Sequence, residues 1–351
     1  MARVCFTHAA GIDSSPQREE LSVSNPEAKQ GSRKFKLPEE TSVFVALVVL
    51  IGIVGALRPT FLKPTNLLNL AASYAIAALL AGCIVFLLSM GEIDLSFGWI
   101  LNLSAVLAGI SMIAGAPVWL GILIGIAAGT VMGALNGVLT VFMRLPLIIV
   151  TLGTASVYQG TSLISNNSGS VVPTDERITQ NIFFRAMGGS IDSPVPIILI
   201  FVLLCFCGLH LLLHKTRFGY RILAIGSNPE AARLAGIPTK KIKIQVCALM
   251  GAVSGVGGVL FLGFRGAVDP STGGQMLLPV VAAAIIGGTP LSGGAGTVWG
   301  SLLGAMIVGV IGVGVVFIGI DAVWGTLVTG LVILFAIGVD QIVRVRKRRA
   351  D

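Results

Sequence analysis

Apolar residues gather along this chain into long runs that are separated by short polar stretches. Several runs reach the roughly 20 residues that an α-helix needs to cross a bilayer. The pattern predicts an all-α polytopic membrane protein of about ten transmembrane helices with Gly-rich discontinuities, and it places the membrane domain at residues 41–340. The predicted spans are 41–57, 66–90, 99–114, 118–142, 146–165, 195–213, 244–264, 275–290, 297–315 and 319–338.

Composition agrees with a membrane-embedded chain. Hydrophobic residues make up 54% of the 351 residues, charged residues make up 11%, and the mean hydropathy is +0.92. A soluble fold of this length could not bury so much apolar surface. The cysteines are scattered without metal-type spacing, so we interpret them as small core residues and expect no disulfide or redox chemistry. They are Cys5, Cys83, Cys205, Cys207 and Cys247.

The distribution of basic residues tests the number of spans. Six lie in the segment 1–40, which is polar and is predicted to be a disordered cytoplasmic leader. Seven lie between residues 215 and 243, and five lie in the basic tail 341–351. Because Lys and Arg accumulate on the cytoplasmic side and each span changes the side, even numbers of spans must separate these segments. Ten spans meet this condition and place both termini in the cytoplasm. The net charge of +8 therefore reflects topology, and nucleic acid is not an expected partner.

Two Gly-rich segments, Gly91–Gly98 and Gly287–Gly294, share the pattern G-x-x-x-L-S-x-G, and each lies between apolar runs. They are either a parallel internal repeat, as in some transporters, or a chance match in a chain with 45 glycines. Irregular backbone at membrane depth is tolerated only where it is buried in protein or lines a cavity. Both segments are therefore expected to border a pathway. Glycines spaced by three or four within other spans predict close helix packing.

Polar side chains within or beside the apolar runs are the candidate pathway residues. Asp94 lies beside a predicted discontinuity, where an ionised carboxylate is costly unless it is solvated, paired or capping a helix. An N-cap role for Asp94 or Ser96 is favoured over contact with cargo. The hydroxyls and amides of the fifth span suit a neutral polyol, but hydrogen bonds between helices would use the same residues. The candidates are Asp94, Ser96, Asn102, Thr151, Thr154, Gln159 and Ser292.

The sequence favours neither a metal site nor a nucleotide site. His210 and His214 are four residues apart, but no third ligand is near them in the sequence. The pattern G-x-x-x-x-G-K-[ST] is absent from the chain, so ATP is not expected to bind through a P-loop. No cofactor is predicted.

Residues 215–243 form the longest charged segment between two apolar runs. Within it Ser227 or Asn228 can cap a helix, Pro229 suits the first helical position, and Gly236 ends it. These signals predict a helix of about two turns, which is marginal in isolation and needs a partner surface. The alternative is a solvated linker.

Three stretches carry a family resemblance. They are T-R-F-G-Y-R-I-L-A-I-G-S-N-P-E-A-A-R-L-A-G-I from Thr216, G-E-I-D-L-S-F-G from Gly91 and G-G-T-P-L-S-G-G-A-G-T-V-W-G from Gly287. The chain resembles, from about Arg58 to Asp340, the permease subunit of bacterial ribose-type sugar importers of the ATP-binding cassette class. This resemblance implies a multi-pass permease of the bacterial inner membrane that is not an enzyme and that imports a monosaccharide such as ribose.

The resemblance also implies several partners. They are a periplasmic sugar-binding protein, a second permease copy or a close relative, the surrounding membrane lipid, and a separate ATPase subunit that binds the ATP. The ATPase would dock on a short cytoplasmic coupling helix. That element comprises Asn228, Pro229, Glu230, Ala231, Ala232, Arg233, Leu234, Ala235 and Gly236.

One departure from the family pattern leaves the cargo class open. The sequence reads Leu277-Leu278-Pro279 where an acidic residue often precedes the apolar run. Two rival functions also remain open. An ion-gradient-driven secondary transporter would normally keep an acid or base relay inside its spans, which here are almost free of ionisable groups. A structural or sensory membrane protein that moves nothing is the other alternative.

Overall fold

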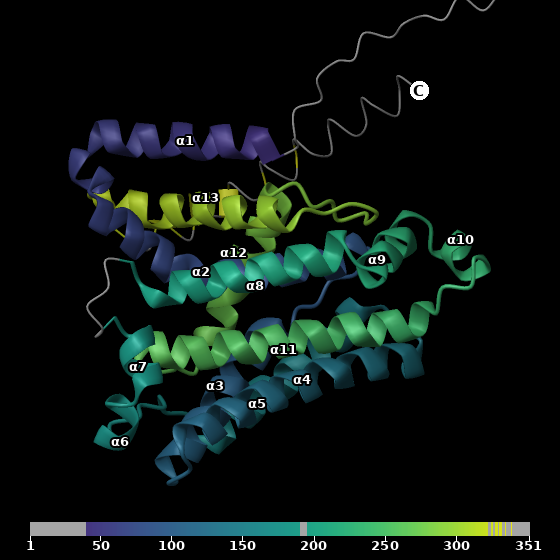
Figure 1. Cartoon of the computed structure of the whole chain (residues 1–351), viewed down its shortest axis with the longest axis horizontal. Coiled ribbons are helices and arrows are strands. Elements are labelled where there is room, and N and C mark those ends of the chain that lie inside the picture. Colours follow the sequence, from purple (N-terminus) through teal and green to yellow (C-terminus); the bar gives the residue numbers. More distant parts are fainter. Residues whose placement is uncertain are drawn as a thin grey trace, which may run out of the picture. The chain divides into compact units, whose positions relative to one another are not determined.

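The computed structural model describes residues 40–189 and 195–321, together with scattered positions between 324 and 338. The regular elements of the described residues are all helices. The β-pairing in this part of the chain is one isolated bridge between Val171 and Val268. The elements, drawn in Figure 1, are α1 (Glu40–Leu57), η1 (Pro59–Leu62), α2 (Pro64–Ser89), α3 (Phe97–Ile113), α4 (Val118–Met143), α5 (Leu147–Ser165), α6 (Glu176–Thr179), α7 (Ile182–Met187), α8 (Ile197–His214), α9 (Arg217–Ser227), α10 (Pro229–Leu234), α11 (Thr239–Arg265), α12 (Thr272–Ile286) and α13 (Val298–Phe317).

The prediction of an all-α polytopic membrane protein is confirmed. Nine of the ten predicted spans correspond to helices whose bounds lie within a few residues of the predicted ones. Seven described helices, α1, α2, α4, α5, α8, α11 and α13, are long and apolar enough to cross a membrane, and α3 and α12 are apolar but shorter. The structure describes the tenth predicted span, 319–338, only at scattered positions, and nine of its 20 residues lie outside the described ones. The tail 341–351 and the leader up to residue 39 also lie outside them.

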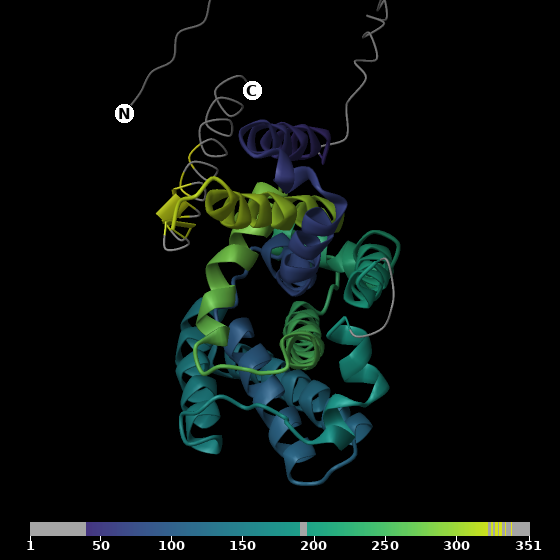
Figure 2. The ribbon, with the colours of Figure 1, turned by 90° about the vertical axis from the view of Figure 1, so that its left-hand side faces the viewer.

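Helix α2 forms the centre of the helical core. Every residue from Ala75 to Ser89 is buried, and α2 packs against α8, α11, α12 and α13. Figure 2 shows α2 lying between α13 and α11. A helix covered on all sides by protein positions its C-terminal end inside the domain rather than at the lipid surface. The break that follows Ser89 is therefore supported by neighbouring helices.

Helices α4 and α11 make the closest long contact of the fold, along a seam of glycines. A Cβ atom on Gly129 would lie 2.7 Å from the Cα of Gly255, and one on Gly133 would lie 2.6 Å from the Cα of Gly251. The two backbones touch because neither helix carries side chains there, which is how helices associate in lipid. The close packing that the glycine spacing predicts is confirmed.

We predict that Gly251→Val destabilises the protein, because the new side chain meets the α4 backbone, which cannot rotate away. Overpacking of this kind costs about 1–3 kcal/mol, and it should lower the midpoint of thermal unfolding in detergent. Gly153→Val on α5 is the matched control, since nothing lies within 4 Å of its added Cβ. Equal midpoints for the two variants would contradict the packed seam.

Candidate functional site

The two Gly-rich segments lie where helices stop, and they meet each other. The first joins α2 to α3, and the second joins α12 to α13. The backbone N–H of Gly294 donates to the carbonyl oxygen of Ser89 at 2.9 Å, and the Ser89 hydroxyl donates to the carbonyl oxygen of Ala295 at 3.1 Å. Gly91 and Gly293 adopt positive φ angles of 74° and 80°, which L side chains rarely take. The two predicted discontinuities thus form hydrogen bonds with each other's backbone groups.

The end of α9 lies against both breaks. A Cβ on Gly226 would overlap the carbonyl oxygen of Ser89 and would lie 2.5 Å from the amide nitrogen of Gly294. A Cβ on Gly293 would lie 2.8 Å from the amide nitrogen of Gly91 and 3.1 Å from the carbonyl oxygen of Gly226. Three backbone segments that are far apart in the sequence therefore touch without intervening side chains. We call these five residues, Ser89, Gly91, Gly226, Gly293 and Gly294, the glycine junction.

Helix α10 starts directly after the glycine junction, and its ends follow the predicted signals. The Asn228 side chain accepts from the backbone N–H groups of Glu230 at 3.1 Å and Ala231 at 3.0 Å, so Asn228 is the cap. Ser227, the other predicted cap, donates instead to the carbonyl oxygen of Leu223. Past the helix, Gly236 has a φ of 78°. Six residues form the helix, and they agree with the predicted two turns.

The side chains of α10 divide into an anchoring and an outward set. Ala232 is 5% exposed and packs in the main apolar core of this chain. Ala232 therefore faces its own protein, and a partner on α10 would contact the exposed side chains of this helix. Leu234 is 82% exposed, an unusual position for an apolar side chain on a charged loop. Glu230, Ala231 and Arg233 are also exposed and surround it with charge.

Helix α9 was not anticipated from the sequence as a separate element. Ile222 and Ile225 are buried, while Tyr220 is 73% exposed, so the helix is amphipathic and lies on the protein. The sequence did contain signals for it. Thr216 is a capping residue type, and in the structure its side chain accepts from the backbone N–H of Gly219. Apolar residues also recur three and four positions apart. α9 carries α10 at its C-terminal end and brings Gly226 into the glycine junction.

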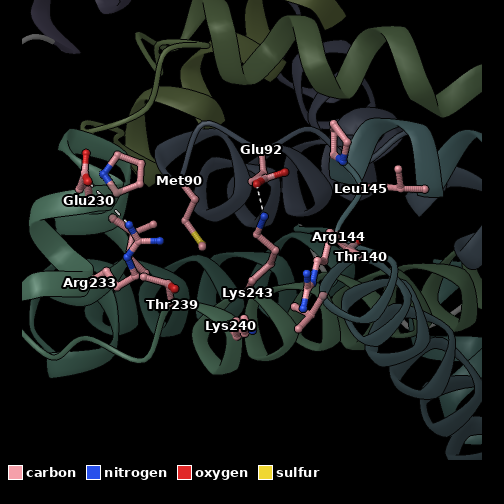
Figure 3. Close-up of a pocket in the computed structure, with 14 residues that line it drawn as sticks. Met90, Glu92, Thr140, Arg144, Leu145, Glu230, Arg233, Thr239, Lys240 and Lys243 are labelled. Atoms are coloured by element: carbon pink, nitrogen blue, oxygen red, sulfur yellow. Dashed lines mark hydrogen bonds and ion pairs between the residues drawn. The ribbon is translucent and has the colours of Figure 1, made fainter.

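A cavity of about 620 Å³ opens between α10, the start of α11, the α2–α3 break and the α4–α5 turn. Figure 3 shows its charged lining. Lys243 of α11 forms an ion pair with Glu92 of the break, and Arg233 faces Glu230 at 3.8 Å within α10. Arg144 ends α4 in the left-handed conformation, at φ 57°. The lining residues are Met90, Glu92, Thr140, Val141, Arg144, Leu145, Pro146, Ile225, Pro229, Glu230, Arg233, Thr239, Lys240 and Lys243.

A buried polar network runs from the first break into α4 and α5. The Asp94 carboxylate accepts from the backbone N–H of Ser96 at 2.6 Å and from its hydroxyl at 2.7 Å. Asn136 of α4 donates to the Ser96 hydroxyl at 2.7 Å, and the Tyr158 hydroxyl of α5 donates to Asn136 at 2.9 Å. These four residues are all buried. Thr151 joins the same region, because its hydroxyl accepts from the backbone N–H of Leu95 at 3.1 Å.

The expected capping role of Asp94 takes a different form. Ser96 is the N-cap of α3 and makes no capping bond with its side chain, and Asp94 lies two residues before it. The carboxylate therefore binds the N-cap residue and shapes the entry to α3. Asn136, which links two helices to this turn, was missed from the sequence. Its signal was an amide within the apolar, Gly-rich α4.

The remaining candidates lie around this network or make other contacts. Asn102 accepts from the Ser162 hydroxyl at 2.6 Å and donates to the carbonyl oxygen of Asp269 at 2.8 Å, so it ties α3 to α5 and to the α11–α12 loop. Thr154 and Gln159 are half-buried on α5. Ser292 is exposed in the α12–α13 break, beside Gly91. The structure thus brings Asp94, Ser96 and Thr151 together, with the Thr154 hydroxyl on the Thr151 carbonyl oxygen, and gives Asn102 a separate set of contacts.

The two histidines of α8 pack with an aromatic side chain. The rings of His210 and His214 have centroids 4.8 Å apart, and the Trp299 ring lies 6.0 Å from His210. Within the described residues, no group of three His, Cys, Asp or Glu residues is close enough to hold a metal ion.

Comparison with known proteins gave consistent matches over most of the chain. Residues 64–337 match the family described as the permease component of the branched-chain amino acid transport system. The ribose import permease protein RbsC of Bacillus subtilis is 35% identical over 298 residues, which cover 85% of this chain and 91% of the relative. The L-arabinose ABC transporter permease protein AraH of Azospirillum brasilense is 35% identical over 318 residues, which cover 90% and 91%.

A third relative carries a different sugar in its name. The galactose/methyl galactoside import permease protein MglC of Salmonella typhimurium is 31% identical over 328 residues, which cover 88% of this chain and 96% of the relative. No solved structure matched the chain.

We predict that Asp94→Asn folds with nearly normal yield and that Asp94→Ala does not. Asparagine keeps an acceptor for the backbone N–H and the hydroxyl of Ser96, whereas alanine leaves both without it, at a cost of about 1–3 kcal/mol for each buried group. The measurement is the yield of monodisperse protein after detergent extraction and its unfolding midpoint. Equal losses in the two variants would show that the charge, and not the acceptor, holds the turn.

Proposed function

We propose that this chain, which belongs to the family described as the permease component of branched-chain amino acid transport, imports a monosaccharide, because relatives that match most of its length are named as sugar permeases. In this proposal it is the membrane subunit of a binding-protein-dependent importer, and ATP is hydrolysed by a separate cytoplasmic subunit. The three relatives reported above are named for ribose, L-arabinose and galactose import, so the proposed cargo is a ribose-like neutral monosaccharide. In this proposal the membrane protein itself is a permease and not an enzyme, which the description of its family and the name of its Bacillus subtilis relative support.

The observation that carries this proposal is the position of α10. A capped, exposed helix with Leu234 projecting outward is joined, through Gly226, to both breaks of the membrane domain. A soluble ATPase that grips α10 would therefore act on two interrupted helices at once. A solvated linker would not need such a connection to the membrane domain.

The proposed orientation places α10, the basic loop and both termini in the cytoplasm of a bacterial inner membrane. Basic residues gather on that side. The opposite face then carries the segment with α6 and α7, which Val171 ties to Val268 by paired backbone hydrogen bonds. We propose that a periplasmic sugar-binding protein docks on this tied segment and delivers the cargo.

We propose that a second permease copy, or a close relative, completes the pathway. Helix α5 supports this role, because it presents Leu152, Val157 and Ile164 outward together with the hydroxyls of Ser156 and Thr161. Both hydroxyls donate to carbonyl oxygens one turn back, which leaves their oxygens able to accept a further bond. A helix with such a mixed face suits a protein-lined path better than lipid.

We predict that sugar uptake requires ATP and a partner ATPase. The purified chain alone, reconstituted in liposomes under a proton or sodium gradient, should accumulate no labelled ribose, arabinose or galactose above empty liposomes. Adding the ATPase subunit, the binding protein and ATP should produce uptake of at least one of the three. Gradient-driven uptake by the chain alone would instead support a secondary transporter, in which the buried Asp94 carboxylate would be the first candidate for an ion relay.

We predict that Leu234→Asp and Glu230→Arg each release the ATPase subunit. The first places a charge in the proposed contact, and the second opposes the positive end of the α10 dipole. Loss of a central interface residue costs about 2 kcal/mol or more, or about 30-fold in affinity. The measurement is coprecipitation of the ATPase with the tagged permease.

Leu234→Met is the matched control for this experiment, since it keeps an apolar side chain at the same exposed position. It should retain the ATPase. All variants should remain folded in the membrane, because neither Glu230 nor Leu234 is buried. If both charged variants retained the ATPase and sugar-stimulated ATP hydrolysis in full, this segment would be a solvated linker and not a coupling helix.

A further inference from the structure

We propose that the cavity beside α10 is a binding site for the phosphate headgroup of an anionic phospholipid. Four cationic side chains line it: Arg144 from α4, Arg233 from α10, and Lys240 and Lys243 from α11. Figure 3 shows Arg233 and Arg144 on opposite sides of the cavity, with Lys243 between them. The inference rests on the proposed orientation, which puts the cavity at the cytoplasmic membrane surface.

The cavity carries an excess of positive charge. Lys243 is paired with Glu92, and both groups are partly buried. Arg233 faces Glu230 at 3.8 Å, but both side chains are exposed, so this pair is weak. Arg144 and Lys240 have neither an ion pair nor a side-chain hydrogen bond within the described residues. Two cations therefore remain without a counter-ion in a concave site.

Backbone dipoles add to the same potential. Helix α11 begins at Thr239, and both Thr239 and Lys240 line the cavity. Pro238 precedes this helix and provides no side-chain cap for its first N–H groups. The positive end of the α11 dipole thus lies beside Lys240, where it favours an anion.

The rim of the cavity favours a lipid over a free phosphate. Leu145 and Pro146 line the cavity in the α4–α5 turn. Beside them Phe142, Met143 and Ile149 are 84%, 53% and 53% exposed. An apolar surface next to a basic pocket fits a ligand that has both acyl chains and a phosphate. Basic pockets between membrane helices on the cytoplasmic side bind such headgroups in this way.

The test uses the full-length permease in detergent micelles and measures bound lipid by native mass spectrometry. The probes are dioleoyl phosphatidylglycerol, which is anionic, and dioleoyl phosphatidylcholine, which is not. We expect the double variant Arg144→Gln/Lys240→Gln to bind phosphatidylglycerol about 30-fold more weakly, since each cation near the membrane surface contributes about fivefold. Phosphatidylcholine binding should not change.

The matched control is Arg217→Gln/Arg221→Gln, which removes the same charge from exposed positions of α9 that do not line the cavity. It should bind phosphatidylglycerol almost as the unmodified protein does. Equal weakening in the two double variants would overturn the site in favour of general surface charge. Unchanged binding in the cavity variant would overturn it outright.

Two further measurements distinguish a bound lipid from free phosphate and from a protein contact. Millimolar inorganic phosphate should not displace phosphatidylglycerol, and full displacement would mean that the cavity takes free phosphate rather than lipid. If the cavity variant loses the ATPase subunit while its lipid binding is unchanged, the basic groups belong to a protein contact and the proposal is wrong. No arm that measures lipid uses ATP or sugar, so failure here is distinguishable from failure of the proposed transport function.

Discussion

Backbone polar groups that are buried where a helix ends must find their partners in the protein, because an unpaired buried group is costly. Ser89 at the end of α2 and Gly287 after α12 are both buried, so each break would be costly if it stood alone. The chain meets this constraint by pairing the breaks with each other, with the Gly294 N–H on the Ser89 carbonyl oxygen. Contact at this distance requires glycine on the facing segments. The rest of the arrangement follows from that pairing.

The α2–α3 break connects elements with different proposed roles. On one side Asp94 and Ser96 tie it to α4 and α5 through a buried hydrogen-bonded chain. On the other side Glu92 ties it to the start of α11 through Lys243. A displacement of α10 would therefore reach helices on both sides of the cavity without requiring any of them to unfold. This is the physical content of the proposed coupling between ATP hydrolysis and the sugar pathway.

Much of the fold could be predicted from the sequence, because long apolar runs and capping residues act locally. The spans, the glycine seam and the short helix after Asn228 all follow from such local signals. The resemblance to ribose-type importers is confirmed by relatives that cover most of the chain. The sequence could not show which distant segments of the chain contact one another. Nothing local shows that Gly226 meets Gly294, or that Asn136 reaches Ser96 across 40 positions.

The burial of Ala232 shows the same limit on a smaller scale. Short helices have an inner and an outer side, and six residues offer too little periodicity to tell which is which. The fold decides it, since Ile222 and Ile225 of α9 pack in the core and Ala232 of α10 packs in the same core. The outward side chain is then Leu234 rather than Ala232.

The glycine junction also limits how this family can be recombined. Because its residues come from three separate regions of the chain, a loop carrying α9 and α10 is shaped to the two breaks that it touches. A chimera that exchanges only that loop between two permeases would bring a foreign backbone against unchanged breaks, where direct backbone contact leaves little room to absorb a mismatch. Exchangeable units in such proteins are therefore sets of contacting segments, and a single continuous stretch of sequence is too small a unit.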